Sequence, residues 1–60
     1  MNKIEKGDVV RVCFNNIGYT LSNRAKVLHI PIAMGDSWVF EDEYGNVHHV
    51  SEGMTVTRIK

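Results

Sequence analysis

Three histidines and one cysteine are the residues of this chain that could bind a metal ion or act as a nucleophile. His48 and His49 are adjacent, and adjacent side chains on a strand point to opposite faces, so the pair is poorly placed to share one ion. His29 and Cys13 lack the close, repeated spacing of structural metal sites. Cys13 is not preceded or followed by the glycine-rich turn that often presents a nucleophile. We expect it to be a small, semi-buried apolar residue of the strand. The sequence therefore predicts no metal site and no cofactor.

Carboxylates crowd the middle of the chain, at Asp36 and in the run Glu41-Asp42-Glu43. Calcium loops place their ligands on alternate residues around a glycine, which this run does not do. Consecutive charges at a strand end instead favour an edge that resists strand-to-strand aggregation, and they could also form an acidic patch for a basic partner. No phosphate-binding glycine loop occurs, and no serine, histidine and aspartate set has a recognisable context. We therefore expect a non-catalytic protein.

Aromatic residues next to turns are the sharpest candidates for binding, because they offer large, stiff contact areas. Trp38 could equally cap the core, and Tyr19 could simply pack its own loop. Neighbouring polar and acidic residues would complete the contact surface. The predicted partner-binding residues are Tyr19, Trp38, Tyr44, Asn16, Arg24, Glu41 and Asp42.

Sixty residues with a formal net charge of zero predict one domain, residues 1–60. Most nucleic-acid binders carry a basic excess, so neutrality shifts the expectation towards a protein partner. A single cysteine fits a reducing cytoplasm, and the start lacks the apolar segment of a signal peptide. Met1 favours a complete gene product. So short a chain is marginally stable alone, which keeps a homo-oligomer open.

The elements that must position these residues are strands, because apolar residues alternate with period two and turn residues separate the runs. The predicted fold is all-β. Proline cannot donate to a strand ladder, so Pro31 should stop the second strand. The expected strands are residues 9–14, 24–30, 37–41, 47–50 and 54–59, with a long first loop over 15–23 and a short helical turn over 51–53. The expected core is Val10, Val12, Phe14, Val27, Phe40, Val50 and Val56, assisted by Leu21 or Leu28.

Residues 6–12, Lys-Gly-Asp-Val-Val-Arg-Val, resemble the opening of SH3-like barrels of the KOW and Tudor kind, in which a glycine-aspartate turn precedes a strand of alternating valines. The resemblance implies a five-stranded SH3-like barrel. It also implies that the first loop and the loop before the third strand flank one groove, lined by Tyr19 and Trp38. The chain lacks the acidic aromatic motif of signalling SH3 domains and the basic excess of ribosomal KOW domains.

Residues 12–16, 35–38 and 50–53 also look like segments of small uncharacterised proteins from phages and prophages. That likeness implies a bacterial cytoplasm and an accessory protein that binds a host or phage protein. The first alternative is a nucleic-acid-binding barrel that uses a basic stripe with an aromatic residue. Its residues would be Arg11, Arg24, Lys26, Arg58 and Tyr19. The second alternative is a homo-oligomer that binds a small molecule or nucleotide. No membrane span is expected.

Overall fold

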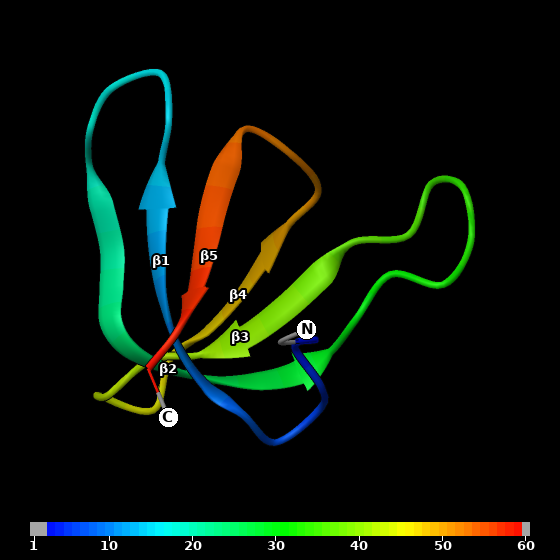
Figure 1. The fold of residues 1–60 in the computed structure, drawn as a ribbon, viewed down its shortest axis with the longest axis horizontal. Coiled ribbons are helices and arrows are strands. Elements are labelled where there is room, and N and C mark those ends of the chain that lie inside the picture. The colour runs from blue at the N-terminus through cyan, green and yellow to red at the C-terminus, as the bar shows by residue number, and fades with distance from the viewer. Residues whose placement is uncertain (1–2, 60) are drawn as a thin grey trace.

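The computed structural model describes residues 3–59, and this part of the chain contains five strands and no helix. Neighbouring strands run antiparallel in the order β4-β3-β2-β1-β5 (Figure 1). The all-β prediction is confirmed. Nothing in the described range could cross a membrane as a long apolar helix. The strands are β1 (Val9–Phe14), β2 (Thr20–His29), β3 (Trp38–Glu41), β4 (Val47–Val50) and β5 (Met54–Arg58).

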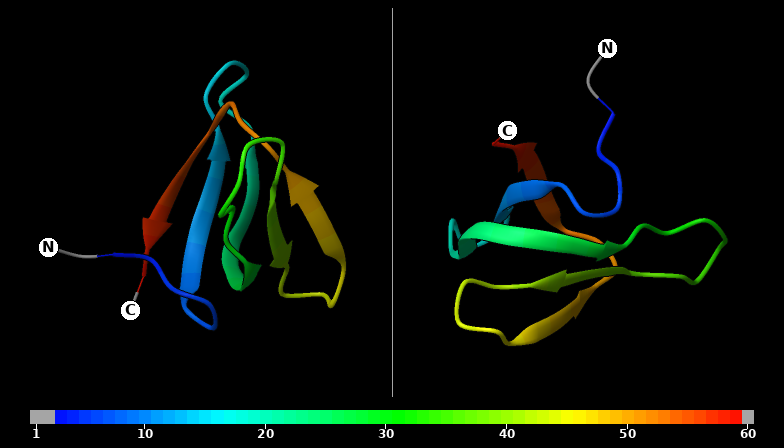
Figure 2. Two further views of the ribbon diagram at one scale, coloured as in Figure 1. Left: turned by 90° about the vertical axis from the view of Figure 1, so that its right-hand side faces the viewer. Right: turned by 90° about the horizontal axis from the view of Figure 1, so that it is seen from below.

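β2 connects the two halves of the sheet. Residues 20–26 pair with β1, and residues 26–29 pair with β3. Register shifts interrupt both pairings, and such bulges bend a strand and increase its twist. Figures 1 and 2 show that the sheet curls strongly along its length. Within residues 3–59 no pairing joins β4 to β5, so the sheet keeps two edges.

The concave face of the curled sheet holds the core. Period two places Val10 and Val12 of β1 inward, and both are fully buried, whereas Arg11 between them is exposed. Phe40 is the largest side chain that is fully buried. The buried core is Val10, Val12, Ala25, Val27 and Phe40, and the half-buried apolar residues packed against it are Ile4, Leu21, Ile30, Trp38, Val50, Met54 and Val56.

The predicted core was therefore largely right, with two differences. Phe14 is half-buried and stacks on Tyr19 at 6.2 Å between ring centroids, instead of packing in the centre. Ala25 is fully buried opposite Val10, although its small side chain gave no signal. Leu21 packs against the core, whereas Leu28 does not belong to it.

The long first loop was wrong. β2 begins at Thr20, so the connection spans only residues 15–19. Phe14 N donates to Tyr19 O at 2.7 Å and Gly18 N donates to Phe14 O at 3.1 Å, which closes a compact hairpin. The polar residues after Thr20 misled the prediction because they belong to an irregular strand, in which register shifts accommodate them.

The short helical turn before the last strand was also wrong. Instead, Glu52 and Gly53 form a bend, in which Gly53 has a positive φ of 82°. That conformation suits glycine and does not continue a helix. The Gly53 carbonyl accepts a hydrogen bond from Asn15 N at 2.9 Å, and Thr55 Oγ1 donates to Asn15 Oδ1 at 2.6 Å. The bend is thus fixed to the start of the β1–β2 loop.

Candidate functional site

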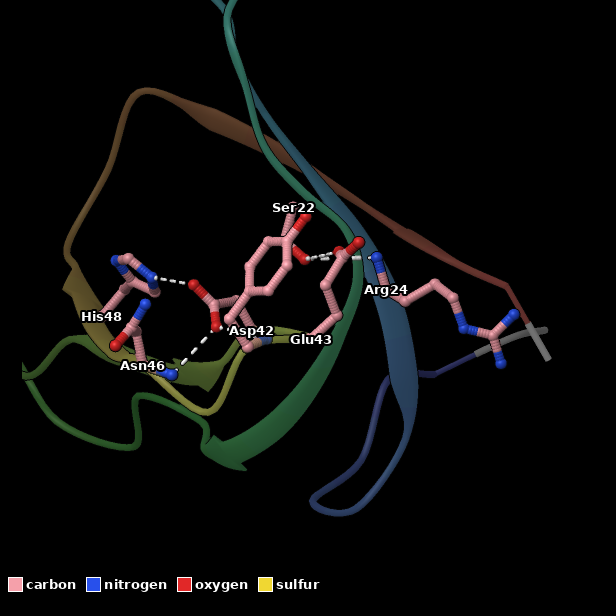
Figure 3. A network of polar contacts seen from close by, with 7 residues as sticks. Ser22, Arg24, Asp42, Glu43, Asn46 and His48 are labelled. Carbon is pink, nitrogen blue, oxygen red and sulfur yellow. Dashed lines mark hydrogen bonds and ion pairs between the residues drawn. The ribbon is translucent and has the colours of Figure 1, made fainter.

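Asp42 organises the β3–β4 turn (Figure 3). Its Oδ1 accepts hydrogen bonds from the backbone N–H groups of Tyr44 and Asn46, both at 2.9 Å. Its Oδ2 lies 2.8 Å from Nε2 of His48 on β4. The His48 contact, followed by the Asn46 and Tyr44 N–H groups, holds the pKa of Asp42 below its usual value of 3.8. This carboxylate is therefore a structural acceptor, with 9% of its side chain exposed.

Ser22 connects the same turn to β2. Its hydroxyl donates to Glu43 Oε1 at 3.1 Å and accepts from Arg24 N at 3.2 Å. Ser22 is 5% exposed, and its hydroxyl is satisfied on both sides. In Figure 3 the Arg24 side chain extends away from Asp42 and His48. The acidic run therefore splits into two roles: Asp42 and Glu43 hold the turn, while Glu41 lies opposite Lys26 in the sheet.

Asp36 organises the β2–β3 loop in the same way. Its Oδ2 lies 2.8 Å from Nε2 of His29 and accepts from Ile32 N at 3.2 Å. Its Oδ1 accepts from Ser37 N at 2.9 Å, and its own N–H donates to Ala33 O at 3.1 Å. These contacts, that with His29 first, hold the pKa of Asp36 below 3.8. One carboxylate thus fixes both ends of the loop.

The loop that Asp36 fixes presents apolar side chains to solvent. Ile32 is 86% exposed, and Met34 is fully exposed. Both residues lie on the same short loop, between Ile30 and Asp36. Beside this loop the chain forms an open groove of about 430 Å³, which we name the lead-in groove. Its lining residues are Lys3, Ile4, Glu5, Lys6, His29, Ile30 and Ile32.

The structure does not join Tyr19 to Trp38 through any ring stack or hydrogen bond within residues 3–59. Tyr19 is 56% exposed and stacks on Phe14. Trp38 is half-buried, stacks on Phe40 at 5.6 Å and 11°, and packs against the core. The contacts of Trp38 are therefore those of a core cap, one of the two roles that the sequence left open.

The other predicted contact residues fall in two places. Asn16 lies exposed in the β1–β2 loop with Tyr19, and Tyr44 lies 82% exposed at the tip of the β3–β4 turn. Arg24 lies on β2, and Glu41 lies at the end of β3, directly before that turn. The described structure therefore brings Arg24, Glu41, Asp42 and Tyr44 to one region and leaves Asn16 and Tyr19 in another.

Three basic residues share the convex face of the sheet. Arg11 alternates with the inward valines of β1, and Lys26 is opposite Val9, so both point outward with Arg24. All three are exposed, and none of the ion pairs within residues 3–59 includes them. Arg58, in contrast, lies 3.6 Å from the Asp8 carboxylate through its Nε.

Sequence reasoning missed the apolar loop and the lead-in groove. The signal was present in the run Ile30-Pro31-Ile32-Ala33-Met34, which places apolar residues where a connection between strands is ordinarily polar. Proline was interpreted only as the end of a strand. No group of three or more histidine, cysteine, aspartate or glutamate side chains within residues 3–59 is placed to hold a metal ion.

The fold and its surfaces define a small, all-β chain with a five-stranded antiparallel sheet. Comparison with known protein families, with curated proteins and with solved structures finds no match.

Proposed function

We propose that this chain is a small, non-catalytic protein-interaction module built on an SH3-like barrel. The barrel is supported by the strand order, in which β5 returns to pair with β1, and by the strong curl of the sheet (Figures 1 and 2). Closure between β4 and β5 would complete it. The observation that carries the interaction function is the apolar β2–β3 loop, with Ile32 and Met34 exposed on a backbone that Asp36 fixes.

A fixed loop favours binding, since a partner that contacts it does not have to order it first. Replacing Ile32 or Met34 should change the stability of the fold little, because both side chains are exposed. The test is selection from a displayed library of random peptides. Peptides should be enriched on the wild-type protein and lost on the Ile32→Ser, Met34→Ser double variant. Equal enrichment on both proteins contradicts the proposal.

A nucleic-acid function is the second candidate, and the outward cluster of Arg11, Arg24 and Lys26 favours it. Unpaired cations on one face suit the phosphate backbone, whose binding weakens steeply with salt. Titration with single-stranded oligonucleotides at low and physiological salt tests it, comparing wild type with Arg11→Glu. Failure to bind at low salt removes this candidate.

A homo-oligomer that binds a small molecule or nucleotide remains the third proposal, and sedimentation of the purified protein tests its assembly. The phage-type accessory role and the bacterial cytoplasmic location remain predictions from the sequence. Genes of phage structure, replication or counter-defence next to this one would support that role.

A further inference from the structure

Two segments form the walls of the lead-in groove, and an aspartate side chain accepts hydrogen bonds from the backbone of each. On one side, Glu5 N donates to Asp8 Oδ2 at 2.8 Å, and Gly7 N donates to Val27 O at 2.8 Å. These bonds fix the segment before β1 against β2. On the other side, Asp36 fixes the loop that follows β2. The groove is therefore formed before any partner arrives. Figure 1 shows the lead-in segment, in blue, beside the green end of β2.

The groove combines an apolar base with a basic rim. Ile4 and Ile30 are half-buried and pack against the core, while Ile32 stands exposed at the wall. Lys3 and Lys6 are both exposed, and neither takes part in an ion pair within residues 3–59.

Among the residues that line the groove, Lys3 and Lys6 carry two positive charges and Glu5 carries one negative charge. Two further carboxylates lie outside the lining and have their own partners. Asp36 faces His29 and the N–H groups of Ile32 and Ser37, and Asp8 lies 3.6 Å from Arg58 Nε. The lining itself is therefore net positive, which favours an occupant with negative charge by charge complementarity.

We propose that the lead-in groove binds an extended, acidic peptide segment of the partner protein, with apolar side chains on the isoleucine base and carboxylates at Lys3 and Lys6. This inference rests on the proposed interaction function and specifies the partner's chemistry. A peptide is favoured over a small molecule because the groove is open, whereas small-molecule sites bury most of their ligand. A peptide can gain further area on Ile32 and Met34.

The experiment uses the full chain and three synthetic ten-residue peptides. The first alternates leucine with glutamate, the second alternates leucine with lysine, and the third alternates serine with glutamate. Binding is followed by two-dimensional amide NMR, which also reports whether each variant is folded. We expect the leucine–glutamate peptide to shift the amides of residues 3–6 and 29–34, and to bind at least about tenfold more tightly than the other two.

Two variants and a control locate the binding. Ile32→Ser removes an exposed wall residue, and Lys3→Glu with Lys6→Glu reverses the rim; each should weaken binding about tenfold. Ile17→Ser is the matched control, because Ile17 is 74% exposed on the β1–β2 loop and does not line the groove. It should bind like wild type. High salt should weaken the wild-type complex and strengthen that of the charge-reversed variant, because salt screens attraction in the first and repulsion in the second.

Three other results would contradict the proposed acidic peptide, and each points to a different explanation. Equal or tighter binding of the leucine–lysine peptide, still sensitive to Ile32→Ser, removes the acidic partner but leaves the interaction function. Amide shifts at the groove on simple concentration of the protein show that the occupant is a second copy of this chain. If no peptide is sensitive to Ile32→Ser, the groove is not the site, and the library selection then decides the proposed function separately.

Discussion

Asp42 and His48 form a contact of 2.8 Å between Oδ2 and Nε2, across a turn whose backbone N–H groups bind the other carboxylate oxygen. Asp36 and His29 form a contact of the same length in the β2–β3 loop, where the Ile32 N–H shares Oδ2 with His29 and the Ser37 N–H binds Oδ1. Two of the connections of this small sheet are therefore each held by an ionised aspartate. Their stability should depend on the charge of that aspartate.

We expect the protein to lose stability as the pH falls below about 4. Both aspartates have a pKa lowered in the folded state, so the unfolded chain takes up protons first as the pH drops through 3.8. The stabilisation is complete above that value and is lost as the pH falls through the lower, folded-state pKa. Thermal unfolding between neutral and acidic pH measures the effect. Asp42→Asn should flatten the profile, and an unchanged slope contradicts this explanation.

Asp42→Ala should destabilise the protein more than Asp36→Ala. The Asp42 side chain is 9% exposed against 29% for Asp36, and its partner His48 is 31% exposed against 40% for His29, so Asp42→Ala removes the more buried carboxylate and leaves the less exposed imidazole without it. Denaturant unfolding of both variants measures the order. Glu52→Ala is a suitable control, because Glu52 is exposed in the bend before β5. A larger loss for Asp36→Ala would contradict the argument.

Trp38→Ala should lower the free energy of unfolding by roughly 2–3 kcal/mol, somewhat less than for a fully buried aromatic residue. Trp38 stacks on the buried Phe40 and packs against the core. Trp38→Phe should recover most of the loss, since a ring can still stack there. Denaturant unfolding followed by far-UV circular dichroism measures both variants. A Trp38→Ala protein as stable as wild type would instead favour the contact role predicted from the sequence.

The strands were predictable where buried and exposed side chains alternate along the sequence with a period of two residues. Val10 and Val12 alternate with the exposed Arg11, and the prediction of β1 matches the structure residue for residue. The beginning of β2 was not predictable in this way. Ser22 is polar, yet it faces the interior, since Glu43 from a distant turn satisfies it. A partner separated by twenty-one positions leaves no local signal.

The surfaces were harder to predict than the strands. The expectation that Tyr19 and Trp38 line one groove stays a prediction. What the sequence could not show is that Tyr19 stacks on Phe14 and Trp38 on Phe40, because tertiary packing sets these contacts. The lead-in groove combines residues 3–6 with residues from 29–32, and the two segments are held together by tertiary contacts such as the hydrogen bond from Gly7 N to Val27 O. The sequence shows each half separately and gives no sign of their contact.

Ser22→Ala should lower the free energy of unfolding by about 1 kcal/mol, the usual net loss for a buried hydrogen-bonded hydroxyl. The Ser22 hydroxyl links Arg24 N on β2 with the Glu43 carboxylate of the β3–β4 turn, so its removal leaves that N–H without its acceptor and frees the turn from β2. Glu43→Gln keeps an acceptor oxygen and should cost less than Ser22→Ala. Denaturant unfolding gives both values, and Ser51→Ala, at an exposed serine, serves as the control. Amide exchange adds a local measure: in Ser22→Ala the Arg24 amide should exchange faster, and an unchanged rate would show that the hydroxyl does not hold it.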